Sequence, residues 1–157
     1  MKKQLETLTI TKVNEETFND LLLLIIRLAE YEKLDPPNEE AKKRLQIDCL
    51  SGKPKYKAFI AKIGNKAVAY VIYFFTYSSF LAQPTLYLED IFVLQEHRQS
   101  GIGKKMFEYC KQIAKQEGCG RIEFTVLKWN TSAQKFYENN KAKRLEWYLY
   151  RVEQNDF

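Results

Sequence analysis

The segment HRQSGIGKKM, residues 97–106, places two glycines among basic residues, between an apolar run and a helix-forming run. A glycine-containing turn at a helix N-terminus directs several backbone N–H groups at one point, and the helix dipole adds partial positive charge there. Glycine also lets a phosphate come close to the backbone, because it has no Cβ in the way. Arg98, Lys104 and Lys105 add full positive charges nearby. The segment therefore predicts a site for a phosphate or pyrophosphate.

Two familiar phosphate motifs do not fit this segment. A Walker loop needs a glycine where Arg98 stands and a serine or threonine where Lys105 stands. A dinucleotide fingerprint needs a third glycine at the position of Met106. The pattern that remains is R-x-x-G-x-G, formed by Arg98, Gly101 and Gly103. Taken alone, this pattern also suits an ordinary helix start.

The flanking chain alternates between strand and helix patterns. Apolar alternation predicts strands at about 7–13, 56–63, 66–77, 85–93 and 121–127, with one or two more within 143–152. Helical spacing and breakers predict helices at about 18–33, 39–50, 101–117 and 131–140, the first two capped by Thr17 and Asn38. The order is β-α-α-β-β-β-α-β-α-β(-β), an α/β fold in which residues 85–127 form a parallel crossover unit. No linker interrupts the chain, so one domain over 1–157 is expected.

Composition narrows the class of protein. The longest apolar run, Leu21 to Ile26, is too short to span a bilayer, and no apolar signal segment follows residues 1–3. Three cysteines at unrelated spacings predict neither disulfides nor a metal site, so we expect a reducing cytoplasm. The net charge of +5 permits nucleic-acid binding, but the lysines are scattered rather than gathered on one face. We therefore expect neither a nucleic-acid nor a membrane partner.

Beyond the glycine loop, several segments carry a resemblance to a known family. They are LAEYEKL (28–34), YFFTY (73–77), LYLEDIFV (86–93), WNTSAQKFYE (129–138) and EWYLYRV (146–152). Together with R-x-x-G-x-G and the element order, the chain resembles the GCN5-related N-acetyltransferase (GNAT) superfamily, in particular its diamine (spermidine/spermine) and thialysine branch. The resemblance implies a mixed, mostly antiparallel sheet whose central parallel strand pair splays at an acyl-CoA cleft. It also implies an enzyme that moves an acetyl group from acetyl-CoA to a primary amine in a ternary complex, and a homodimer.

The same resemblance implies which residues bind the cofactor. Backbone groups at the end of strand 85–93 would hold the pantetheine arm and polarise the thioester, and the glycine loop would cradle the pyrophosphate. The implied cofactor-binding residues are Ile91, Phe92, Val93, Arg98, Gln99, Ser100, Gly101, Ile102, Gly103, Lys104, Asn130, Ala133 and Tyr137. For Asn130, helix capping alone is an alternative explanation.

The proposed chemistry makes two demands on protons. An alkyl amine with a pKa near 10.4 arrives protonated, so a group must accept a proton before it can attack. Glu89 is the candidate, either as this base or only as a partner for the ammonium. Tyr137 matches the family's acid, which protonates the departing thiolate; a core aromatic is the alternative. His97, the only histidine, is expected to be a solvated loop residue.

Acidic residues gather where the amine is expected. Glu30, Glu32, Asp35, Glu39 and Glu40 surround the first inter-helix turn and predict a negative wall, although the helix dipole alone explains the last two. By resemblance, the amine contacts are Tyr31, Glu32, Glu89 and Asp90. Strand alternation places Glu89 on one face and Asp90 on the other. Proteins or other small amines remain alternative acceptors, and a CoA-binding sensor without catalysis remains an alternative function.

Overall fold

The computed structural model describes residues 7–157, so residues 1–6, in which no signal segment was predicted, lie outside it. The chain forms two compact units that divide between Thr125 and Val126. No helix within the described range is both long enough and apolar enough to cross a bilayer.

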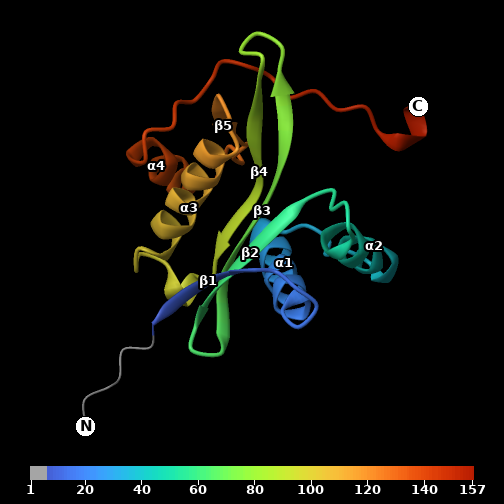
Figure 1. The fold of residues 1–157 in the computed structure, drawn as a ribbon, viewed down its shortest axis with the longest axis vertical. Helices are drawn as coiled ribbons and strands as arrows, with labels where there is room; N and C mark the ends of the chain where they lie inside the picture. Colours follow the sequence, from blue (N-terminus) through green and yellow to red (C-terminus); the bar gives the residue numbers. More distant parts are fainter. Residues whose placement is uncertain (1–6) are drawn as a thin grey trace. The chain divides into compact units, whose positions relative to one another are not determined.

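The first unit is built on a five-stranded sheet whose strands lie in chain order (Figure 1). The strands are β1 (Leu8–Lys12), β2 (Lys57–Ile63), β3 (Lys66–Ser78), β4 (Gln83–Val93) and β5 (Arg121–Glu123). Neighbours are antiparallel except β4 and β5, which are parallel. Gly64, with a φ of 58°, makes the turn between β2 and β3. The prediction of a mixed, mostly antiparallel sheet is therefore confirmed.

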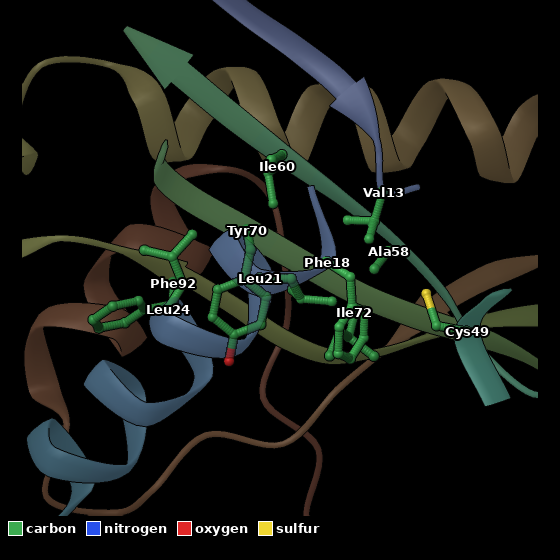
Figure 2. Packing of buried hydrophobic residues seen from close by; sticks show 10 residues of the cluster. All are labelled: Val13, Phe18, Leu21, Leu24, Cys49, Ala58, Ile60, Tyr70, Ile72 and Phe92. Atoms are coloured by element: carbon green, nitrogen blue, oxygen red, sulfur yellow. The ribbon is translucent and has the colours of Figure 1, made fainter. Parts of the chain in front are cut away.

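Helices cover both faces of this sheet. Helices α1 (Phe18–Glu32) and α2 (Glu39–Leu50) lie on one face, and α3 (Ile102–Gln116), which follows the short 3-10 turn Gln95–His97, lies on the other (Figure 1). Figure 2 shows the core on the α1 side, formed by Val13, Phe18, Leu21, Leu24, Cys49, Ala58, Ile60, Tyr70, Ile72 and Phe92. Alternation along β2 turns Phe59 to the opposite face, where its ring meets Tyr109 of α3 at 4.8 Å.

The predicted helix caps have different outcomes. Asn38 caps α2 as expected, because its Oδ1 accepts a hydrogen bond from the Ala41 N–H at 2.9 Å. The cap predicted at Thr17 is wrong: its hydroxyl makes no capping bond to α1. Instead Thr17 Oγ1 accepts from the Asn14 N–H at 3.0 Å, and the Thr17 N–H donates to Asn14 Oδ1 at 3.0 Å. The hydroxyl of Thr17 is therefore engaged in a turn with Asn14, before α1 begins, and does not cap the helix.

The strand predictions near the C-terminus are partly wrong. β5 ends at Glu123 rather than 127, and residues 143–152 form no strand. The second unit consists of α4 (Thr131–Asn139), extended chain and a 3-10 turn, Gln154–Asp156. A strand needs a hydrogen-bonded neighbour, and the described part of this unit contains no other strand for residues 143–152 to pair with.

Candidate active site

β4 contains a bulge at the two candidate carboxylates. Asp90 lies opposite Ile72 and Leu88 lies opposite Tyr73, so Glu89 is an extra residue on β4. The expected alternation, with Glu89 and Asp90 on opposite faces, is therefore wrong, because a bulge interrupts the period of two. Both residues line the same hollow. The bulge thus brings two carboxylates to one site.

This hollow has apolar walls and an acidic part. Its volume is about 390 Å³, within the usual range of small-molecule sites. The walls come from three elements of the first unit and include Ile25, Leu45, Ile72 and Phe74. Such a hollow suits an aliphatic chain that ends in an ammonium group near Glu89 and Asp90.

Tyr70 forms a hydrogen bond with Asp90, the less exposed of these two carboxylates. It is fully buried in the core, and its hydroxyl donates to Asp90 Oδ2 at 3.2 Å. Burial, and after it the negative charge of Glu89, raise the pKa of Asp90 to about 6, although the hydrogen bond from Tyr70 opposes the rise. Burial also raises the pKa of Glu32, whose charge acts on both Asp90 and Tyr70. A bound cation would relieve this concentration of negative charge.

The sequence did not identify Tyr70 as part of the site. Its neighbours in VAYVIYFF predict a buried strand, and a buried tyrosine within such a strand fits the core. Only the register of β3 against β4, with Tyr70 opposite Phe92 and Ile72 opposite Asp90, brings its hydroxyl to the carboxylate.

Tyr31, at the end of α1, is joined to the glycine loop by Arg98. The guanidinium of Arg98 lies over the Tyr31 ring, 4.3 Å from its centre, and 5.5 Å from that of Phe92. Arg98 Nε donates to the Val93 carbonyl at 2.9 Å. Arg98 was predicted as a cofactor residue, and the structure places its side chain against the residue predicted to contact the amine.

The glycine loop has the backbone geometry of an anion site. Gln99 and Gly101 both have positive φ, at 60° and 84°, and α3 begins directly after them. Gly101 provides no side-chain cap, and the first turn of α3 contains no acidic residue. The leading N–H groups of α3 therefore have no partner within the helix, and the exposed Lys104 and Lys105 follow them. A Cβ on Gly101 would meet no atom within 4 Å, so the turn is open to a ligand.

The edge of β4 fits the predicted pantetheine contacts. Parallel pairing with β5 ends at Tyr87 opposite Glu123. From there to Val93, β4 is paired only with β3 among the strands that the structure describes. Its backbone groups on the β5 side can therefore bind a polar chain such as pantetheine. Phe92 and Ile102 can take part only through their backbone, because both side chains are buried in the core.

The remaining predicted cofactor residues lie in the second unit. Asn130 caps α4, since its Oδ1 accepts from the Ala133 N–H at 3.1 Å, which is the alternative that the sequence left open. Tyr137 is nearly buried, and its ring lies 5.1 Å from that of Phe136. The roles of Asn130, Ala133 and Tyr137 toward the cofactor and thiolate stay predictions.

Ion pairs within α1 and α2 reduce the net negative charge of the predicted negative wall. Glu30 pairs with Arg27 at 2.9 Å, and Glu39 pairs with Lys42 at 2.6 Å. Glu40 lies 3.9 Å from Arg44. Glu32 is half-buried and acts on Asp90, so it is the member of the wall that belongs to the site.

Comparisons with known proteins agree with this geometry. The model of the Acetyltransferase (GNAT) family matches residues 22–141. A thialysine N-epsilon-acetyltransferase of Bos taurus is 33% identical, with 92% of this chain and 91% of the relative covered. A spermidine/spermine N(1)-acetyltransferase-like protein 1 of Homo sapiens is 30% identical, with 87% of this chain and 21% of the relative covered.

Among solved structures, an integron cassette protein of V. cholerae has a TM-score of 0.81 at 23% identity, covering 95% of this chain and 94% of its own. That likeness supports the fold. The family match and the sequence relatives show that the chain belongs to the GNAT family, in its polyamine and thialysine branch, and is an acetyl-CoA-dependent N-acetyltransferase.

Proposed function

We propose that the acceptor is the primary amine of a small diamine, polyamine or thialysine-like molecule. The observation that carries this proposal is the pair Glu89 and Asp90 in one apolar-walled hollow, beside the edge of β4 that has no β5 partner. Carboxylates attract the ammonium form of the amine, and the apolar walls accept its methylene chain.

Residues of β4 have different roles in the proposed reaction. Acetyl-CoA, when bound, supplies the acetyl group as a thioester, which the amine attacks directly in a ternary complex. Glu89 is exposed and accepts a proton from the ammonium, directly or through water. Asp90, held by Tyr70, keeps the amine in place by its charge. A backbone N–H among Ile91, Phe92 and Val93 polarises the thioester carbonyl.

The remaining roles toward the cofactor are proposed from the resemblance to the family. Gln99, Ser100, Gly101, Gly103 and Lys104 surround the pyrophosphate at the start of α3. Asn130 and Ala133 contact the pantetheine arm, and Tyr137 protonates the departing thiolate. The family match spans parts of both units, which supports one acetyltransferase domain over the whole chain.

We also propose that two copies form a homodimer through the C-terminal tail. Trp147, Tyr148, Leu149 and Tyr150 are all highly exposed, Tyr148 and Tyr150 at 85% and 88%. A run of large apolar side chains that expose this much area is typical of an interface, and the run has strand propensity but no strand partner in its own unit. Light scattering should give a dimer mass, and truncation after Arg144 should give a monomer. A monomer mass for the full chain would contradict the dimer.

A reducing compartment such as the cytoplasm suits the cysteines. Cys49, Cys110 and Cys119 are all unpaired, and the first two are buried. Burial raises the pKa of Cys110 to about 12, so its thiol stays protonated and unreactive. Localisation of the tagged protein in its own cells would test this assignment.

A thiol-release assay tests the proposed function. Acetyl-CoA is offered with diamines, polyamines, lysine analogues and a lysine-containing peptide, and free CoA is followed over time. We expect small diamine-type acceptors to accelerate CoA release more than the peptide does. Binding of acetyl-CoA by calorimetry without acceleration by any amine would instead favour a CoA-binding sensor.

A further inference from the structure

Tyr70 carries a hydroxyl from the core to the wall of the acceptor hollow. Its ring is fully buried among the core side chains on the α1 side, and its centre lies 6.1 Å from that of the Phe92 ring (Figure 2). Its hydroxyl donates to Asp90 Oδ2 at 3.2 Å, and Asp90 lines the hollow together with Glu89. A core side chain therefore acts on the acceptor site through this hydrogen bond.

The packing around Tyr70 fixes the direction of its hydroxyl. The pairing of β3 with β4 sets the backbone, since Tyr70 lies opposite Phe92 and Ile72 lies opposite Asp90. A close-packed core leaves a buried ring little room to move. A buried hydroxyl without a partner also costs free energy, so the ring gains nothing by turning away from Asp90. The hydroxyl is therefore a fixed donor, and it determines where one oxygen of Asp90 lies.

The groups around Asp90 affect its charge in opposite directions. Burial, and with it the negative charges of Glu89 on β4 and Glu32 on α1, raise the pKa of Asp90. The hydrogen bond from Tyr70 lowers this pKa, because a donor stabilises the ionised carboxylate. Tyr70 on β3 therefore opposes the effect of the neighbouring carboxylates.

Two other polar side chains line the hollow, and both are bonded elsewhere. Lys55, in the loop between α2 and β2, has its Nζ 3.0 Å from Asp48 Oδ1. Tyr56, at the start of β2, donates its hydroxyl to the Leu45 carbonyl at 2.6 Å. Tyr70 is therefore the side chain whose donor stabilises the charge of Asp90.

We propose that Tyr70 is a positioning residue for the acceptor: its hydroxyl holds Asp90 Oδ2, so that the ammonium group of the amine binds Oδ1. Tyr70 is fully buried and does not touch the acceptor, so it acts through Asp90. The same hydrogen bond keeps Asp90 ionised at neutral pH, where an ammonium group needs its charge. This inference rests on the proposed function, because it concerns binding of the amine at the same site.

Tyr70→Phe tests this role, because it removes the hydroxyl and keeps the ring. KM for putrescine, spermidine and thialysine should rise about threefold or more at pH 7, the size expected for one hydrogen bond. Both kcat and the Kd of CoA should change little, because the proposed role concerns only the ammonium group. Tyr73→Phe is the matched control. It removes a nearly buried hydroxyl from the opposite face of the same strand, where the Tyr73 ring lies 5.9 Å from that of Phe59, and should leave KM unchanged.

The pH dependence separates positioning of a charge from a packing defect. Without the donor, the pKa of Asp90 should rise, so the carboxyl takes up a proton at a higher pH. The ratio of kcat/KM of the wild type to that of Tyr70→Phe should therefore be largest at pH 6 and fall toward a small constant value at pH 8.5. Titration of the amine itself cancels in this ratio. When both proteins also carry Asp90→Asn, the ratio should be close to one at every pH, because the group through which Tyr70 acts has no charge.

The outcomes distinguish this inference from the function on which it rests. A ratio that stays constant between pH 6 and pH 8.5, or an equal loss when Asp90→Asn is also present, would overturn the role of Tyr70 while leaving amine acetylation intact. Acetylation of none of the three amines, with acetyl-CoA still bound, would overturn the proposed function and this inference with it.

Discussion

The guanidinium of Arg98 lies 4.3 Å from the centre of the Tyr31 ring, and this contact ties the loop after β4 to the end of α1. The same side chain donates from Nε to the carbonyl of Val93, the last residue of β4. One arginine therefore joins the end of β4, the start of the glycine loop and Tyr31, the residue predicted to contact the amine. A change at Arg98 should therefore alter the surroundings of Tyr31 as well as the start of the glycine loop.

Arg98→Lys should weaken acceptor binding more than cofactor binding. Lysine keeps the positive charge but loses the planar stack and the Nε bond. A cation–π contact of this kind contributes about 0.5–2 kcal/mol, so KM for the amine should rise about twofold to thirtyfold. Calorimetry should show a change of about twofold or less in the Kd of CoA. Arg44→Lys, on the exposed face of α2, is the control. A loss confined to CoA affinity would contradict the placement of Arg98 on the amine side.

Gly101→Ala should weaken CoA binding without a clash inside the protein. Gly101 has a φ of 84°, which an alanine adopts only with strain of about 1 kcal/mol, while the added Cβ would meet nothing within 4 Å. We expect the Kd of CoA to rise fivefold or more, because relief of the strain moves the N–H groups of the turn. Gly52→Ala is the control, since that Cβ also meets open space but its backbone has no positive φ. Equal effects of the two changes would rule out a special role for this turn.

The sequence predicted the parts of the site that depend on local chemistry. These parts depend on a few neighbouring residues each. The structure confirms a glycine turn before α3, the cap of α2 by Asn38 and the sheet. The bulge at Glu89 depends on how β4 pairs with β3, and the sequence shows no break in the alternation. The orientation of the Arg98 side chain likewise depends on Tyr31, which is far away in sequence. The sequence alone therefore could not predict it.

The missing C-terminal strand has the same origin. Residues 143–152 do have the amino-acid composition that favours a strand. A strand forms only beside a partner, and the described part of its own unit supplies none. The prediction was therefore wrong because no partner strand is present, and not because these residues disfavour a strand.

Tyr137→Phe should lower kcat with little change in CoA affinity. The substitution removes only the hydroxyl and keeps the ring that packs near Phe136, so the fold of α4 should survive. Loss of a general acid usually lowers the rate by about 10²-fold or more. Tyr77→Phe, at an exposed position on β3, is the control. An unchanged kcat would show that Tyr137 only packs within the second unit and is not the acid.

Asp90→Asn should stabilise the protein at neutral pH but not at acid pH. The pKa of Asp90 is raised by burial from 3.8 to about 6, so its ionisation disfavours the folded state. The stability associated with the protonated carboxyl is present below about pH 4 and is lost as the pH rises through 6. At about 1.4 kcal/mol per pKa unit, the loss above pH 6 is at most about 3 kcal/mol.

Asparagine has no charge to desolvate, and its Oδ1 can still accept the hydrogen bond from Tyr70. Urea unfolding should therefore show a gain of about 1–3 kcal/mol for Asp90→Asn at pH 7.5 and little change at pH 4. Asp35→Asn, in the exposed turn between α1 and α2, should change stability little at either pH. A gain of equal size at both pH values would assign the effect to packing rather than to charge. A loss at pH 7.5 would mean that the carboxylate stabilises the fold, and that Asp90 is not a strained charge held ready for an ammonium.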